Sequence, residues 1–112
     1  MVRQFHQAIG QDLDQEYQQN SSLDRLRMKL VSEHFDEVAS AETPDNLLKE
    51  LAYLVYVTYG YAAAFGWDLD EAVRRVHASN MSKLDHQGNP VFREDGKVLK
   101  SENYQAPEIS LL

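Results

Sequence analysis

Residues 44–65 form the longest apolar segment of the chain, and they constrain its fold more than any other stretch. Thr43, Pro44 and Asp45 predict a helix start, because Thr caps a helix, Pro fits its first position and Asp favours its positive dipole end. Gly66 predicts where this helix stops. Its apolar side chains point in nearly every direction, so other elements must enclose it. A chain of 112 residues has few such elements, and we therefore expect a homo-oligomer, either a dimer or a tetramer.

Three further segments carry helix signals. Apolar residues at helical spacing open the chain, and Gly10 among them favours a short helix. Ser21 begins a capping-box-like sequence before a helix that reaches about residue 41. A second capping box starts at Asp68 and predicts a helix through about residue 81. Gly60, inside the apolar helix, indicates a close crossing with another helix.

The sequence changes character after Lys83. Residues 88–90, Gly-Asn-Pro, signal a turn, and Asp95-Gly96 between two short apolar pairs predicts a small hairpin with a two-residue turn. The last residues predict an irregular tail laid over a surface; they include Pro107, Ile109, Leu111 and Leu112. The predicted fold is all-α: a bundle of about four helices with a short C-terminal hairpin and tail, in a single domain over residues 1–112.

Charge and composition exclude several classes of function. Eighteen acidic residues against eleven Lys and Arg give a net charge of −7, which disfavours electrostatic binding to nucleic acid or to an anionic membrane. The chain has no cysteine, so disulfides, thiol nucleophiles and thiolate metal sites are ruled out. The N-terminus lacks the apolar core of a signal peptide. We therefore expect a soluble, cytoplasmic protein with no nucleic-acid or membrane partner.

Carboxylates in the second predicted helix point toward its apolar side. At about 100° per residue, Glu33, His34 and Glu37 fall within or beside the stripe of leucines, and the charged residues that include Asp24 fall on the opposite side. Burying an unpaired charge costs several kcal/mol, so such acids need a cation, hydrogen bonds or a raised pKa. Glu50 stands among leucines of the next helix. If the two helices pack antiparallel, Glu33, Glu37 and Glu50 converge into a site for magnesium or manganese.

Structural roles for these residues are the alternative. The acids then flank the stripe and pair with Arg27, Lys29 or Lys49, and His34 is a hydrogen-bonded packing residue. The other histidines show no metal-ligand spacing. Four polar residues toward the C-terminus either bind a polyphosphate or are ordinary solvated surface residues. They are Asn80, Lys83, Lys97 and Lys100.

Four segments of the chain resemble one known superfamily. They are residues 30–38 (Leu-Val-Ser-Glu-His-Phe-Asp-Glu-Val), residues 49–60 (starting Lys-Glu-Leu-Ala-Tyr), Asn-Met-Ser-Lys at 80–83 and Asp-Gly-Lys-Val-Leu-Lys at 95–100. The sequence is similar to the all-α nucleoside triphosphate pyrophosphohydrolases, which include MazG-like proteins, dimeric dUTPases and phosphoribosyl-ATP pyrophosphohydrolases, and most to the short MazG-like branch. This resemblance implies an intertwined helical dimer or dimer of dimers. It also implies magnesium-dependent hydrolysis of a nucleoside triphosphate between its α and β phosphates.

The resemblance assigns roles to particular residues. Glu33 and Glu37 match the metal-binding Glu-Glu-x-x-Glu motif, and Glu50 matches the first position of Glu-x-x-Asp. His34 replaces the second Glu, and Tyr53 replaces the Asp. Positions used around the nucleotide and its phosphates match Asn80, Lys83, Lys97 and Lys100. Imidazole is a poor magnesium ligand but a better manganese ligand, and phenol is not ionised at neutral pH.

Two functions therefore stay open from the sequence. In the first, the protein is a pyrophosphohydrolase in which the glutamates hold one metal ion and one of them, or His34, activates water. In the second, it is a catalytically impaired relative that binds a nucleotide or only a protein partner, because two of the expected acidic ligands are absent. A fold-level resemblance cannot choose between them, since function belongs to the site.

Overall fold

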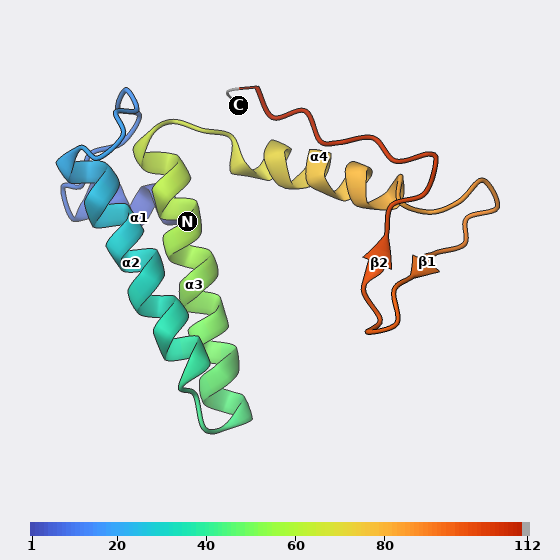
Figure 1. Cartoon of the computed structure of the whole chain (residues 1–112). Helices are drawn as coiled ribbons and strands as arrows, with labels where there is room; N and C mark the ends of the chain where they lie inside the picture. The colour runs from blue at the N-terminus through green and yellow to red at the C-terminus, as the bar shows by residue number, and fades with distance from the viewer. Residues whose placement is uncertain (111–112) are drawn as a thin grey trace. The chain divides into compact units, whose positions relative to one another are not determined.

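The computed structural model describes residues 1–110, which form four helices and one two-stranded sheet in two compact units. The first unit comprises Met1–Trp67 and the second begins at Asp68. In chain order the elements are α1 (Val2–Ala8), α2 (Ser22–Ala39), α3 (Pro44–Ala64), α4 (Leu69–Met81), β1 (Val91–Phe92) and β2 (Val98–Leu99) (Figure 1). The predicted all-α class is confirmed.

Side-chain caps set the starts of the three long helices, as the sequence predicts. Ser21, Thr43 and Asp68 each accept a hydrogen bond from the backbone N–H three residues later. The helix α2 ends at Ala39, two residues before the expected end, and α3 ends just before a left-handed Gly66.

The helices α2 and α3 run antiparallel side by side, and α1 packs against α3 (Figure 1). The apolar core lies at the C-terminal end of α3, where Ala62, Ala63, Ala64 and Phe65 are buried. The segment after α1 donates backbone hydrogen bonds to the carbonyls of Ala63 and Ala64, at 3.0 and 2.8 Å. These bonds satisfy carbonyl groups that a helix end leaves unpaired.

The N-terminal part of α3 keeps much of its apolar surface exposed. Leu48 has 71% of its surface accessible, and four neighbours on α3 are also exposed: Leu47, Leu51, Tyr53 and Val55. The two helices beside α3 thus do not provide the enclosure that its all-round apolar sequence requires. The predicted homo-oligomer remains a prediction, and this surface is the observation that motivates it.

Asp24 is buried, which corrects the expectation that it faces solvent. Only 7% of its surface is exposed, and its carboxylate accepts hydrogen bonds from the Tyr61 hydroxyl and from the backbone N–H of Asn20. The spacing of about 100° per residue along α2 could not predict this burial, because both hydrogen-bond partners of Asp24 lie outside that helix. Hydrogen bonding to Tyr61 and then to Asn20 lowers the pKa of Asp24, and burial with this carboxylate raises the pKa of Tyr61 to about 12.

Folding stability is expected to fall in acid partly through Asp24. Its pKa is lower folded than unfolded, so its contribution is present above the unfolded value and is lost as the pH falls through the folded value. Asp24→Asn should reduce that pH dependence. Urea unfolding from about pH 7 to about pH 3 measures it, with the exposed Asp36→Asn as control. Identical pH slopes in both variants and the parent would contradict the assignment.

Gly60 lies where α1 crosses α3, as the sequence predicts. A Cβ atom there would come within 3.0 Å of two ring atoms of the buried His6 and 3.2 Å of Nη1 of Arg27. His6 is held by its contacts with the Val2 carbonyl at 2.7 Å and with Arg27 at 2.8 Å, so neither neighbour is free to retreat. The missing side chain therefore allows the helices to approach each other.

Gly60→Ala is expected to lower the free energy of unfolding by about 1 kcal/mol. Overpacking costs about 1–3 kcal/mol, and the gain in helix propensity offsets about 1 kcal/mol of it. Urea unfolding measures the difference. Thr58→Ala, at an exposed position of the same helix, is the control without overpacking; it raises helix propensity and removes only the bond of the Thr58 hydroxyl to the Leu54 carbonyl. A stabilised Gly60→Ala protein would show that the crossing is looser than the structure indicates.

The second unit contains α4 and the hairpin. β1 and β2 are antiparallel, with Val91 opposite Leu99 and Phe92 opposite Val98. The predicted hairpin is confirmed, but its turn is longer than the two residues expected. The N–H of Gly96 donates to the Arg93 carbonyl, and Gly96 adopts a φ of +90°. This is a turn followed by a left-handed glycine, the usual form of a three-residue loop.

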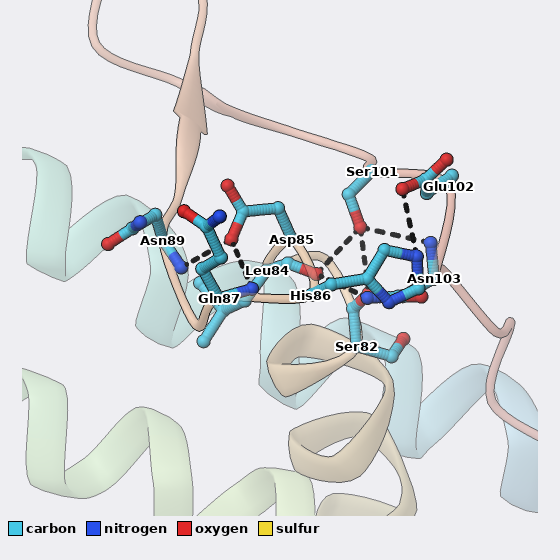
Figure 2. Close-up of polar contacts among 9 residues, drawn as sticks. All are labelled: Ser82, Leu84, Asp85, His86, Gln87, Asn89, Ser101, Glu102 and Asn103. Atoms are coloured by element: carbon cyan, nitrogen blue, oxygen red, sulfur yellow. Dashed lines mark hydrogen bonds and ion pairs between the residues drawn. The ribbon is translucent and has the colours of Figure 1, made fainter.

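Side-chain hydrogen bonds fix the loop between α4 and β1 (Figure 2). The carboxylate of Asp85 accepts from the backbone N–H groups of Gln87 and Asn89, at 2.9 and 2.8 Å. The hydroxyl of Ser101, just after β2, donates to the Leu84 carbonyl at 2.7 Å. The hairpin is thereby tied at its base to the end of α4.

The described part of the tail is irregular and lies over a surface of its own chain, along α4. The Ser79 hydroxyl donates to the Gln105 carbonyl at 2.7 Å, and Arg75 donates to the Glu108 carbonyl at 3.1 Å. Leu111 and Leu112 lie outside the described residues. Within residues 1–110, no helix has the length and apolar character needed to cross a membrane.

Candidate metal centre

The antiparallel pairing of α2 and α3 brings ionisable side chains from both helices together. His34 and Glu37 lie one turn apart on α2, and Glu50 lies in the second turn of α3. One potential ligand atom from each of the three residues lies within 4.8 Å of the other two. Nδ1 of His34 and Oε2 of Glu37 are 3.6 Å apart, which is longer than a hydrogen bond. We call these three residues the acidic cluster.

Two atoms of the acidic cluster are buried and have no hydrogen-bond partner. They are Oε2 of Glu50, whose side chain is only 13% exposed, and Nδ1 of His34. The other oxygen of Glu50 is 3.5 Å from Nζ of Lys49. A buried carboxylate oxygen without a donor is costly. Together with a neighbouring carboxylate and an imidazole, it is a donor set that suits a divalent cation.

Electrostatic repulsion within the acidic cluster is visible in Glu37. Close approach of the Glu50 carboxyl raises the pKa of Glu37, and burial and the negative charge of Glu50 act in the same direction. The positive charge that His34 can carry partly opposes this rise. Either a proton or a cation would relieve this repulsion, so a divalent cation would have to compete with protonation of Glu37.

Glu33 is not among the three convergent residues. It is exposed and lies 3.9 Å from Nζ of Lys29, one turn earlier on α2. Its charge is still close enough to raise the pKa of Glu37. Ion pairing with lysine was the structural alternative for these acids, and it describes both this contact and that of Glu50 with Lys49. A metal-binding role for Glu33 stays a prediction.

Tyr53 lies three residues after Glu50 on α3 and stacks on His34. The two ring centroids are 5.4 Å apart with 13° between the planes. The residues that replace two expected acidic ligands thus contact each other through their rings. Tyr53 is 50% exposed. Its phenol lies beside the cluster but supplies no carboxylate oxygen to it.

An apolar groove adjoins the acidic cluster within the first unit. Its volume is about 750 Å³, and His34, Tyr53 and Lys49 belong to its lining. Aromatic residues from α1 and α3 line it too, and Phe5 and Tyr56 meet edge to face with centroids 6.1 Å apart. Cavities of this size and character commonly bind small molecules.

Arg27 and His6 also line this groove, and the sequence had not indicated them as site residues. The sequence predicts a structural role for His6 and indicates Arg27 only as an ion-pair partner for acids. Helical spacing could have indicated Arg27, because it follows Leu23 by four residues and therefore interrupts the apolar stripe of α2.

The four residues expected near the phosphates all lie in the second unit. Asn80, at the end of α4, is exposed, and Lys83 is half-buried just beyond it. Lys97 is exposed beside the hairpin turn, and Nζ of Lys100 lies 4.6 Å from the ring centroid of Tyr104. Contacts of these residues with a phosphate stay a prediction.

Two comparisons place the chain among known proteins. The family model described as phosphoribosyl-ATP pyrophosphohydrolase matches residues 2–80, which include the whole acidic cluster. An uncharacterized protein of Acanthamoeba polyphaga mimivirus is 27% identical over 115 aligned residues. That alignment covers 93% of the present chain but only 43% of the viral protein.

Proposed function

Because the chain belongs to the phosphoribosyl-ATP pyrophosphohydrolase family, in the MazG-like all-α superfamily, we propose that it is a metal-dependent nucleoside triphosphate pyrophosphohydrolase. Membership of this family supports an activity as a hydrolase that acts on nucleotides. The observation that carries the finer proposal is the acidic cluster, in which a buried oxygen of Glu50 lacks a donor and meets a second carboxylate.

The metal ion is held by Glu37 and Glu50, with His34 and Glu33 completing the set. The raised pKa of Glu37 and the unpartnered atoms of His34 and Glu50 support this assignment. Manganese suits an imidazole better than magnesium does, so both ions are candidates. When bound, the ion supplies positive charge that stabilises the developing charge on the phosphates.

The reaction is hydrolysis between the α and β phosphates. Water adds to phosphorus, the bridging P–O bond breaks, and the products are a nucleoside monophosphate and pyrophosphate. One of the glutamates or His34 accepts the proton of the attacking water. Asn80 and the lysines bind the phosphates and stabilise their charge; these lysines are Lys83, Lys97 and Lys100.

One domain over residues 1–112, assembled as a homodimer or tetramer, completes the proposal. The exposed apolar side of α3 supports assembly, since a second copy would remove it from water. Light scattering after gel filtration at micromolar concentration is expected to give a multiple of the 12.9 kDa chain mass. A monodisperse particle of the chain mass would contradict this expectation.

A nucleotide panel with magnesium and with manganese tests the function. Turnover is read as released pyrophosphate, and binding is read as a thermal shift. Pyrophosphate release supports the hydrolase. A thermal shift without turnover supports the alternative, an impaired relative that only binds a nucleotide. The observation that favours this alternative is the stacking of His34 on Tyr53 at two positions where acidic ligands are expected. If no nucleotide gives pyrophosphate release or a thermal shift, both the hydrolase and the nucleotide-binding relative are wrong.

A further inference from the structure

Arg27 is a buried cation without an acidic partner among the residues that the structure describes. It is 2% exposed, and Nη1 lies 2.8 Å from Nε2 of His6. Nδ1 of His6 is 2.7 Å from the Val2 carbonyl, so it donates there, and Nε2 is left to accept from Arg27. A neutral histidine in this role orients the guanidinium but does not neutralise its charge.

The remaining donors of Arg27 form a defined recognition edge. Nε and Nη2 are both buried and have no hydrogen-bond partner in the described part of the chain. These two N–H groups lie on the same edge of the planar guanidinium and point in parallel, which is the geometry that binds two adjacent acceptors at once. The contact with His6 occupies the third nitrogen and therefore leaves this edge free for a ligand.

The surroundings indicate what kind of ligand would use this edge. Arg27 lines the groove together with the aromatic residues Phe5 and Tyr56. The lining also includes His34 of the acidic cluster and Tyr53, which stacks on His34. A flat heterocycle can pack against such aromatic side chains, and the acidic cluster beside the groove suits the phosphates. Both donors are buried in this structure, so contact with a base requires a local opening of the groove.

We propose that Arg27 is a specificity-determining residue whose Nε and Nη2 donors bind two adjacent acceptors on the base of the nucleotide. Guanine offers O6 and N7, and cytosine offers its carbonyl oxygen and the neighbouring ring nitrogen. Adenine and uracil have no such adjacent pair on the same edges. His6 is a positioning residue. The inference rests on the proposed function, because the nucleotide is what brings a base into the groove.

Binding of nucleoside monophosphates with manganese tests this inference without turnover. GMP and CMP are expected to bind about tenfold or more tightly than AMP and UMP to the parent. Arg27→Met should remove this preference, and Arg27→Lys should retain little of it, because lysine keeps the charge but lacks the paired donors. Arg25→Met removes an exposed arginine from the same helix and should preserve the preference.

Inorganic phosphate is a separate arm, because its oxygens also offer two adjacent acceptors. Binding of phosphate that is lost in Arg27→Met, without any preference among bases, would overturn the assignment to a base edge. Equal base preference in the parent and Arg27→Met would overturn the role of Arg27 altogether. Removal of an unpaired buried charge should not unfold the protein, and urea unfolding of both Arg27 variants checks this.

Turnover separates this inference from the proposed function. If Arg27→Met releases pyrophosphate from all four triphosphates in the same proportions as the parent, the inference fails and the hydrolase stands. If the parent shows the base preference in binding but releases no pyrophosphate, the hydrolase fails and the recognition by Arg27 stands.

Discussion

Glu50→Gln is expected to lose the thermal stabilisation that manganese gives to the parent protein, and to lose pyrophosphate release with it. Glu50 supplies the buried oxygen without a donor, and an amide oxygen in its place carries no charge to hold a divalent ion. Even residues that only support metal ligands change affinity by about 10–100-fold when mutated. We therefore expect manganese affinity to fall by at least about 100-fold.

The same variant separates a metal site from a structural ion pair. Without metal, Glu50→Gln should be at least as stable as the parent, because it removes the repulsion that raises the pKa of Glu37. A structural role with Lys49 predicts the opposite, a loss of stability with or without metal. Glu42→Gln, at an exposed position before α3, is the matched control. An unchanged manganese shift in Glu50→Gln would refute the metal centre.

The double variant His34→Glu with Tyr53→Asp is expected to raise magnesium-dependent pyrophosphate release by about tenfold or more. The two residues lie beside Glu37 and Glu50, and they replace hard oxygen ligands that magnesium prefers. The measurement is pyrophosphate released from a panel of nucleoside triphosphates at saturating magnesium. The gain should be larger with magnesium than with manganese, because manganese already accepts imidazole.

A neutral pair of substitutions controls for the loss of ring stacking. His34→Gln with Tyr53→Asn removes the same rings and adds no carboxylate, so it should release no more pyrophosphate than the parent. Circular dichroism and gel filtration establish that both variants fold and assemble. If the acidic double variant is well folded and releases no more pyrophosphate than the parent from every nucleotide, the assignment of the metal centre is wrong.

Much of the candidate site could be predicted from the spacing of residues along two helices. Glu37 on the apolar stripe of α2 and Glu50 among leucines on α3 were expected to meet, and their convergence follows from an antiparallel helix pair. The position of Glu33 shows the limit of this reasoning. It lies at the edge of the stripe, where a small rotation of the helix decides between the cluster and a surface contact with Lys29.

Residues that sequence reasoning missed share one property: their partners are distant in the chain. Asp24 is buried by Tyr61, 37 positions away, and Arg27 is oriented by His6, 21 positions away. The helical spacing of a residue shows which side of its own helix it occupies, but not which residues of a neighbouring helix it contacts. Whether a charged residue at the border of a stripe is buried depends on which side chain the neighbouring helix presents there.

Local sequence signals were enough to predict the helices and the residues at which the three long ones begin. Caps such as Ser21, Thr43 and Asp68 act on backbone groups within one turn, so they depend on nothing farther away. Three contacts depend instead on how the helices pack. His34 stacks on Tyr53, His6 lies against Gly60, and Arg27 is buried without an acidic partner among the described residues. The physical reason is that these contacts depend on the rotation and separation of packed helices, which no local pattern in the chain specifies.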